Sequence, residues 1–457
     1  MVENMSETLT VQKLKKINSI ISSMTKKLKP DNSILKEVDN SVLSINKMLS
    51  QSRIGAECVK GGSIAKNTFL KNDHDIDLFV RFALKYKGKN ISDILEPILS
   101  KAFPKITISK IHGSRDYFQF SKNSLEYEII PVLKIHASNY ADAENVTDLS
   151  PEHVAWVESY TSKNPSLNDE IRVTKQFMKA NNVYGAESYI NGFSGHIVDI
   201  LIIHYGSFLS LIKKFASLEK PSSKNPIIID HEQNMKNPLK ELNQSKISPL
   251  IIIDPIQKDR NAAAALNAEK LSLFIDTCKN FLETPTEDLF KINKFDLENH
   301  IKVIINNLKK GNEKSSIRKF QIILIELYPH ESSKDIMGTK IYKTYEDIKK
   351  QLILNGFTVM GDIWHFDATS KSGIICFIFE DKKLSITIEQ SGPPLNIIDD
   401  VNNFREKHEK TYIRGNRIFS VVERKYVLPE ELLKKLFSED FIKSRMKRIS
   451  MKASKVL

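Results

Sequence analysis

The sequence predicts an α+β protein with three domains: a mixed βα sheet, a helical middle and an α+β C-terminal half. The chain has 457 residues, and domains of ~150 residues each give a prior of three. Apolar residues recur at a spacing of three and four near the N-terminus, whereas apolar strands of alternating pattern dominate the C-terminal part. We expect the domains at 1–147, 148–284 and 285–457, with Pro285-Thr286 at the second boundary.

The first domain begins with two helices and continues as a small mixed sheet. Val11, Ile17 and Met24 belong to the apolar stripe of the first helix. Pro30 ends that helix, and the second helix runs over 34–52. The predicted strands are 76–82, 106–110, 117–121 and 126–133, and a further helix is predicted over 91–102.

The middle domain is mainly helical, with helices predicted over 168–181 and 193–216. The segment 220–248 is polar, and Ile227–Ile229 and Ile251–Ile253 are predicted as short strands around a loop. We expect this domain to close a pocket against the first.

The sequence pattern of the C-terminal domain predicts antiparallel strands with one packed helix. Its predicted strands are 320–328, 357–367, 372–380 and 383–392, and its helix is 341–355. Phe377–Phe379 resembles a ring set that stacks RNA bases, but core packing is favoured because no RNA-binding consensus accompanies it. The basic stretch from Lys443 to Leu457 has no acid, which is typical of a frayed solvated tail, with phosphate contacts as the alternative.

The most informative motif is Asp75-Ile76-Asp77, twelve residues after Gly62-Ser63. Residues i and i+2 of a strand share a face, so Asp75 and Asp77 are expected side by side. They repel unless a cation neutralises them, and two Mg²⁺ ions about 4 Å apart would also align the oxygens of phosphoryl transfer. A helix opening at Gly62-Ser63 suits a triphosphate. Each part alone is more often a strand edge or a cap, but together they predict nucleotidyl transfer.

A two-metal site of this kind usually needs a third acid on a neighbouring strand. Glu126 and Glu128 share one face of the predicted strand 126–133. Both are candidates, and an ordinary amphipathic strand with a charged outer face is the alternative.

Several segments together match the pattern of one family. They are GGSIAKNTFL (61–70), DIDLFV (75–80), EYEIIPVLKI (126–135), SPEHVAW (150–156), IRVTKQFMKANNVYGAE (171–187), NGFSGHIVDILIIHYGSF (191–208), IIDPIQKDRNAAAAL (252–266) and, more loosely, SGPPL (391–395). On these segments the chain resembles the archaeal class I CCA-adding enzymes, which are tRNA nucleotidyltransferases of the DNA polymerase β-type superfamily. The resemblance implies a polymerase β-type palm, a helical central domain, and an α+β C-terminal body and tail that bind tRNA.

The resemblance implies that Asp75, Asp77 and Glu128 are the catalytic residues and the ligands of two Mg²⁺ ions. Glu128 stands where the family typically has Asp, and its register with Pro131 favours it over Glu126.

The resemblance also implies a set of nucleotide-binding residues. They are Gly62, Ser63, Lys66, His153, Lys175, Tyr184 and Arg260. Arg260, in DPIQKDRN, matches an arginine that reads the incoming base and touches the tRNA backbone. The segment Leu149–His153 departs from the family pattern R-T-P-x-H, so one phosphate-facing cation is missing or comes from elsewhere. Taken singly, each of these residues would more often be a packing or solvated side chain.

We therefore expect template-independent addition of C, C and A to the 3′ end of tRNA, from CTP and ATP, with release of pyrophosphate. A poly(A) polymerase or an oligoadenylate synthetase shares the palm and is the second interpretation. An inactive RNA-binding protein is the third, and the intact Asp75 and Asp77 disfavour it.

The composition agrees with a polyanionic partner. The formal net charge is +12, which suits tRNA. Cys58, Cys278 and Cys376 are far apart and odd in number, which disfavours disulfides and zinc and fits a reducing cytoplasm. The sequence lacks an apolar run near the ~20 residues that span a bilayer and an apolar signal core at its N-terminus. We expect a cytoplasmic protein that binds no membrane, and we leave a homodimer open.

Overall fold

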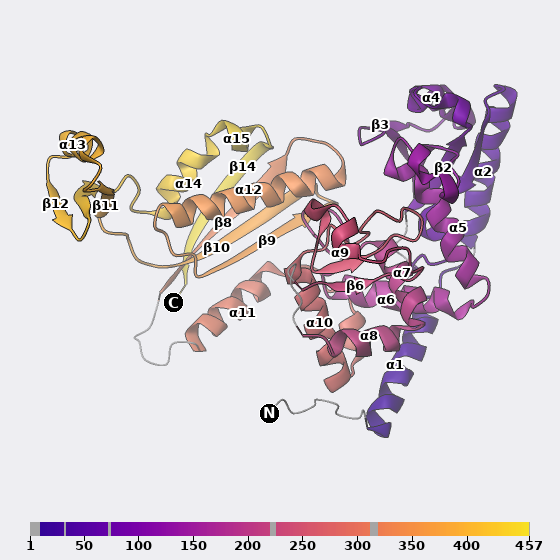
Figure 1. Cartoon of the computed structure of the whole chain (residues 1–457), viewed down its shortest axis with the longest axis horizontal. Helices are drawn as coiled ribbons and strands as arrows, with labels where there is room; N and C mark the ends of the chain where they lie inside the picture. The colour runs from indigo at the N-terminus through magenta and orange to yellow at the C-terminus, as the bar shows by residue number, and fades with distance from the viewer. Residues whose placement is uncertain (1–9, 32, 72–74, 220–224, 311–318, 457) are drawn as a thin grey trace. The chain divides into compact units, whose positions relative to one another are not determined.

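The computed structural model divides into two compact units, Met1–Asn293 and Lys294–Leu457, whose elements are labelled in Figure 1. The described residues are 10–31, 33–71, 75–219, 225–310 and 319–456. The start of the predicted loop, at 220–224, therefore lies outside them, as does Asn32 at the predicted helix break. The first two predicted domains fall within the first unit, and the three-way division stays a prediction.

The first unit contains a five-stranded sheet in the order β1-β2-β5-β4-β3. The strands are β1 (Ala56–Lys60), β2 (Ile76–Phe82), β3 (Ser109–Ile111), β4 (Tyr117–Lys122) and β5 (Leu125–Leu133). β2 and β5 run parallel, and the other pairs are antiparallel. Ile76, Leu78 and Val80 pack into one core with α2 (Ser33–Gln51) and α4 (Ile91–Ala102). The alternate residues of β2 are thereby left for the opposite face.

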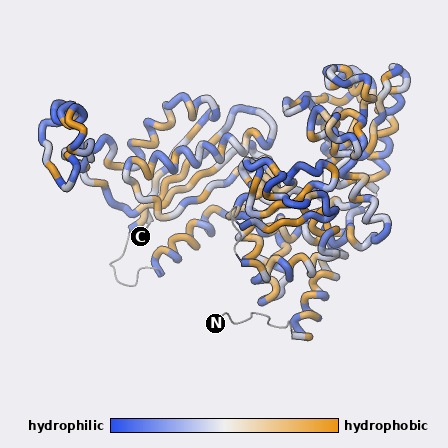
Figure 2. Tube along the Cα trace, viewed as in Figure 1, coloured by the Kyte–Doolittle hydropathy of each residue, from blue (hydrophilic) through white to orange (hydrophobic). Residues whose placement is uncertain are grey.

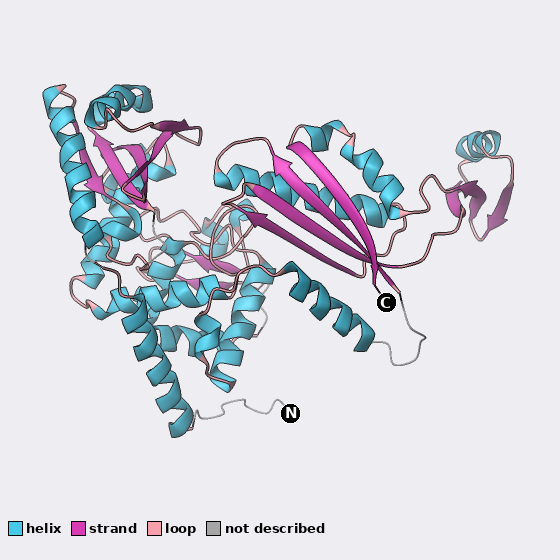
Figure 3. Ribbon diagram, turned by 180° about the vertical axis from the view of Figure 1, so that it is seen from behind, coloured by secondary structure: helices cyan, strands magenta, loops and turns pink. Residues whose placement is uncertain are grey.

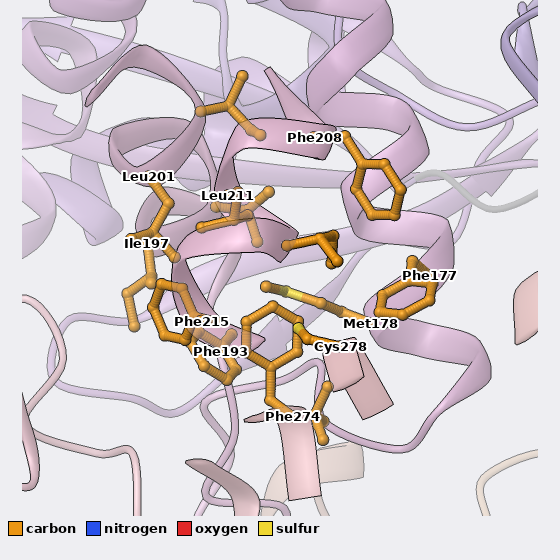
Figure 4. Close-up of a cluster of buried hydrophobic side chains, with 14 of the residues drawn as sticks. Phe177, Met178, Phe193, Ile197, Leu201, Phe208, Leu211, Phe215, Phe274 and Cys278 are labelled. Atoms are coloured by element: carbon orange, nitrogen blue, oxygen red, sulfur yellow. The ribbon is translucent and has the colours of Figure 1, made fainter. Parts of the chain in front are cut away.

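A second core in this unit is built from helices. They are α1 (Val11–Leu28), α5 (Ser150–Thr161), α6 (Ser166–Ala180), α7 (Gly195–Tyr205), α8 (Phe208–Ala216) and α10 (Ala268–Glu283). Phe177, Phe208, Phe281 and Phe290 form an aromatic cluster with centroids 5.2 to 5.7 Å apart. Figure 4 shows the part of this core around Phe177, Phe208 and Phe274. Phe290 follows the expected boundary at Pro285 but belongs to this core.

The two N-terminal helices serve different cores. Ile17, Ile20 and Met24 of α1 pack in the helical core, and α1 lies against α6. α2 instead contacts β1 and α4 of the sheet. The sequence pattern placed both helices with the sheet, because an apolar stripe indicates that a helix is packed but not what it packs against.

The predicted helix 193–216 is two helices, α7 and α8. Gly206 breaks it with φ of +80°, a left-handed conformation that favours glycine. Within the described part of the chain, no single helix is long and apolar enough to cross a membrane; only α7 and α8 taken together, across a 93° bend, pass that test of length and composition. The expected short strands are β6 (Ile227–Ile229) and β7 (Leu250–Ile252), a parallel pair, with the short helix α9 (Pro238–Glu241) between them.

The second unit is built on an antiparallel sheet in the order β14-β8-β10-β9, seen as long arrows in Figure 3. Its strands are β8 (Phe320–Pro329), β9 (Gly361–Asp367), β10 (Ser372–Glu380) and β14 (Met446–Val456). One face packs on α12 (Lys334–Leu354), α14 (Pro429–Phe437) and α15 (Asp440–Lys443), and the other on α11 (Leu297–Lys310). Phe377 and Phe379 are buried in the first of these cores, so the core-packing interpretation is confirmed. The apolar character of β8 and β10 is visible in Figure 2.

Two C-terminal features differ from the expectation. The basic tail is a strand, because β14 pairs along the edge of β8 and buries Met446, while Arg448 stacks 3.8 Å over the Tyr328 ring. The predicted strand 383–392 leaves the main sheet. It appears as β11 (Thr387–Pro394) in a separate sheet with β13 (Arg417–Glu423) and β12 (Thr411–Arg414), next to α13 (Ile398–Lys407).

All three cysteines are buried and free. Burial, with Asp362 nearby, raises the pKa of Cys376 to about 12. The thiols are therefore poor nucleophiles at neutral pH.

The aromatic cluster predicts the cost of truncating one of its rings. Phe281→Ala removes a fully buried ring from α10, so the free energy of unfolding should fall by about 3–5 kcal/mol. Leu273→Ala is the matched control, because this side chain of the same helix is 40% exposed and should cost well under half as much. Denaturant melts of both variants measure the difference; equal losses would mean that α10 is not packed as described.

Candidate active site

Asp77 and Glu128 lie opposite each other on the two parallel strands of the first sheet. Asp77 is the second residue of β2, and it pairs in register with Glu128 of β5. Registered partners on adjacent strands present their side chains on the same face, here the face away from the Ile76 core. Asp75 directly precedes β2 and is exposed. Glu126 is also exposed and accepts a hydrogen bond from Ser121.

The carboxylates crowd one another. Burial, then Glu128 and then Asp75, raise the pKa of Asp77 to about 7, against the opposing influence of Lys66 and Lys175. Gln119 donates to Glu128 at 2.6 Å. Two neighbouring acids oppose the ionisation of this buried carboxyl. A bound cation would relieve the repulsion among the three groups. The oxygen donor set fits Mg²⁺ or another hard divalent cation.

Gly61 and Gly62 let the preceding loop lie directly on Asp77. The Gly61 N–H donates to the Asp77 carbonyl at 2.8 Å. Gly62 has φ of +51°, and a Cβ built on it would lie 1.7 Å from Asp77 Oδ2. Only glycine fits this position. Ser63 follows in α3 (Gly62–Ala65), where its carbonyl accepts the Thr68 N–H at 2.9 Å.

Two lysines flank the same cluster and share one carboxylate. Lys66, just after α3, forms a salt bridge with Asp199 of α7. Lys175 of α6 lies 4.0 Å from Asp199. Its ammonium group donates to the hydroxyl of Thr68 at 3.0 Å and to the carbonyl of Thr68 at 3.2 Å. Asp199 is fully buried, and the sequence analysis did not assign it to the site.

Asp254 gathers a second set of cations. His153 Nε2 lies 2.8 Å from its Oδ1, and the Arg260 guanidinium donates to its Oδ2 at 2.7 Å. The backbone N–H groups of Ile256 and Gln257 also donate to Oδ1, at 2.9 and 3.0 Å. Against burial, which raises it, hydrogen bonds from His153 and His196 hold the pKa of Asp254 well below its usual range.

His196 of α7 completes this second group. Its ring lies 4.2 Å from that of His153 and 3.5 Å from Asp254. Burial first, and His153 second, lower the pKa of His196 to about 4, so the ring is neutral at physiological pH. Among the described residues, ligand atoms of His153, His196 and Asp254 lie within 4.8 Å of one another. A divalent cation fits poorly there, because Arg260 and two backbone N–H groups already occupy the carboxylate.

Tyr184 lies beyond the lysines. It forms an isolated bridge with Phe193, just before α7, and the Lys179 ammonium is 5.0 Å from the centre of its ring. Its hydroxyl approaches the first turn of α7, since a Cβ built on Gly195 would lie 3.0 Å from it.

The sequence-predicted residues thus fall into two groups in one unit. Asp75, Asp77, Glu128, Lys66 and Lys175 are electrostatically coupled, whereas His153 and Arg260 meet at Asp254. The sequence analysis missed Asp199, Asp254 and His196. One signal was available for Asp199, which is the only acid in the apolar run GHIVDILIIHY.

Models of three known families match consecutive parts of the chain. Residues 41–143 match the nucleotidyltransferase domain, 169–291 match "tRNA nucleotidyltransferase, second domain", and 319–448 match "CCA-adding enzyme, C-terminal domain".

Curated relatives cover most of the chain. It is 36% identical to the CCA-adding enzyme of Nanoarchaeum equitans, over 81% of this chain and 86% of the relative. The enzyme of Pyrococcus abyssi is 30% identical, over 79% and 75%, and that of Sulfurisphaera tokodaii 28%, over 89% and 91%. Among solved structures, the Cid1 poly(U) polymerase has a TM-score of 0.49 at 12% identity, covering 61% of this chain and 99% of that chain.

The carboxylate cluster predicts a pH-dependent stability. Asp77 ionises near pH 4 when unfolded but near 7 when folded. The folded protein therefore holds more protons between these values, and its stability falls as pH rises through that window. Asp77→Asn should gain stability over wild type between pH 5 and pH 8 in cation-free buffer.

Adding Mg²⁺ at pH 8 should raise the melting temperature of wild type by a few degrees and leave Asp77→Asn nearly unchanged. NaCl at equal ionic strength is the control. The same Mg²⁺-induced rise in both proteins would refute a cation site at Asp77.

Proposed function

The chain belongs to the family of archaeal CCA-adding enzymes and has their activity, the template-independent addition of CCA to tRNA, and from that premise we propose which of its residues carry out the reaction. Its partner is tRNA and its substrates are nucleotides; we propose CTP and ATP, with release of pyrophosphate. The single observation that carries the residue assignment is the parallel register of Asp77 with Glu128, beside a glycine loop and the lysines Lys66 and Lys175.

We propose that Asp75, Asp77 and Glu128 hold two Mg²⁺ ions. When bound, such ions lower the pKa of the attacking ribose hydroxyl and stabilise the leaving pyrophosphate. Glu128 is preferred to Glu126 because it lies opposite Asp77, whereas Glu126 is exposed and bonded to Ser121. The raised pKa of Asp77 supports the assignment, since a cation would relieve that charge.

The triphosphate is assigned to the surroundings of the glycine loop. Gly62 brings the backbone against Asp77, and Ser63 follows with its hydroxyl. Lys66 and Lys175 would supply positive charge to the phosphates, because both already act on Asp77. His153 and Tyr184 are proposed as further contacts. His153 is held in place by Asp254, and Tyr184 lies at the first turn of α7.

Base selection is assigned to Arg260. A guanidinium offers directional donors in a plane, and here one nitrogen is held by Asp254 while the side chain stays 34% exposed. An anchored but accessible arginine can donate to a base edge with little loss of conformational entropy.

The other nucleotidyltransferase interpretations lose support from the matched segments. A poly(A) polymerase or oligoadenylate synthetase shares the palm, but the matches at 169–291 and 319–448 are to tRNA nucleotidyltransferase and CCA-adding enzyme domains. An inactive RNA-binding protein is disfavoured because the acids, the glycine loop and the lysines are all in place. We propose that the basic C-terminal half binds the body of the tRNA.

Paired substitutions test the function and the third carboxylate together. On tRNA lacking its CCA end, wild type should incorporate CMP and then AMP, whereas Glu128→Gln should lose about 10²–10⁴-fold of both activities. Glu126→Gln, the matched control from the same strand face, should stay within a few-fold of wild type. The reverse result would move the assignment to Glu126, and a wild type that only adds a run of adenylates would favour the poly(A) interpretation.

Arg260→Lys tests base selection. The lysine keeps the charge but lacks the planar set of N–H donors with which a guanidinium can bind Asp254 and a base at once. The kcat/KM ratio of CTP and ATP to UTP and GTP should therefore fall more than tRNA affinity does. Lys258→Met, an exposed change in the same loop, should leave that ratio unchanged. A constant ratio in Arg260→Lys would show that selection resides elsewhere.

A further inference from the structure

Asp199 is a charge in an otherwise apolar helix. The other residues of α7 that are buried, such as Ile197 and Leu201 (Figure 4), pack in the helical core. Asp199 is 0% exposed in their midst. Removing a carboxylate from water costs several kcal/mol, and replacing a buried ion pair by apolar side chains is often neutral or stabilising. Folding alone therefore gives little reason for an acid here.

We propose that Asp199 is a positioning residue for the triphosphate, which holds the ammonium groups of Lys66 and Lys175 together where the phosphates of the nucleotide meet them. The inference rests on the proposed function, because it requires a triphosphate at these lysines. Lys66 comes from the end of the glycine loop and Lys175 from α6, so one carboxylate joins two elements that otherwise repel each other through their charges.

The bonding of Asp199 differs from that of a structural acid. Asp148, equally buried, pairs with Arg115 and also accepts backbone N–H groups from Leu133, Glu144 and Asn145. Asp199 is bonded to Lys66, and its Oδ1 has no hydrogen-bond partner among the described residues. That oxygen lies 4.0 Å from Lys175. Asp148 therefore organises backbone, whereas Asp199 serves the two ammonium groups.

The charges around Lys175 give this arrangement a pH signature. Lys66 faces it from the glycine loop, and Arg172 and Lys179 lie on its own helix. Burial first, then these cations, lower the pKa of Lys175 to about 8, and Asp199 opposes them. The charged form is lost as pH rises through that value. Asp77 of β2 also acts on Lys175 and ionises near pH 7, so its titration lies on the acid side of the loss assigned to Lys175. Without Asp199, the loss should begin at a lower pH.

The test compares Asp199→Asn with Asp148→Asn, a buried acid outside the proposed nucleotide contacts. Steady-state kinetics on tRNA lacking CCA would give KM and kcat for CTP and for ATP between about pH 6.5 and 9, where Lys175 titrates. Because the triphosphate is common to both nucleotides, Asp199→Asn should raise both KM values by the same factor, about tenfold, as for a lost charge-assisted contact. Its alkaline fall in kcat/KM should move to lower pH.

A double-substitution cycle separates positioning from general damage. In a Lys175→Met background, Asp199→Asn should raise KM much less than it does in wild type, and the shift of the pH profile should vanish. Equal KM changes in Asp148→Asn, an unmoved pH profile, or full additivity would each overturn the proposal.

Two further readouts keep the result interpretable. If Asp199→Asn does not fold, Asp199→Glu keeps the charge, and a KM near that of wild type is expected; a tenfold rise at an unmoved pH profile would refute positioning by charge. An inactive wild type would refute the proposed function instead, so the two failures are distinguishable.

Discussion

The parallel pairing of β2 with β5 is the constraint on which the candidate site depends. It puts Asp77 opposite Glu128, and burial prevents water from screening the repulsion between the two acids. The negative charge of these two acids explains the groups that surround them. The glycine loop must approach without a side chain, lysines must come near, and a cation has to complete the balance. The repulsion between these acids is one that the proposed metal ions would relieve.

Positive charge in the same unit is organised by two buried acids with different tasks. Asp199 gathers Lys66 and Lys175, close to the carboxylates. Asp254 gathers Arg260 and His153 and fixes its own loop through backbone donors. The proposed phosphate contacts and the proposed base contacts therefore rest on separate anchors, because each set of cations has its own carboxylate. His196, kept neutral by burial, touches the second set without adding charge to it.

Much of the candidate site could be predicted from local sequence patterns. The rest depends on which strands and distant residues lie next to one another in the fold. The D-x-D motif and the glycine loop are short-range features, so sequence located them. The choice between Glu128 and Glu126 could not be derived from alternation, which places both on one face; the register with Asp77 distinguishes them. Asp254 was missed because the two histidines beside it lie far along the chain, with His153 about a hundred residues away. β14 was missed because an edge strand needs one apolar face only, and its charges dominate the pattern.

The assignment of α1 to the helical core has a consequence for synthesis of the chain. α1 ends at Leu28, and its partner α6 begins at Ser166. At about 5–20 residues per second, the ribosome needs roughly 7 to 28 s to make the intervening stretch. Throughout that interval, Ile17, Ile20 and Met24 lack the α6 part of their core, although α2 can already pack against the nascent sheet. During synthesis, α1 is therefore an amphipathic helix whose apolar side faces water until α6 has been made.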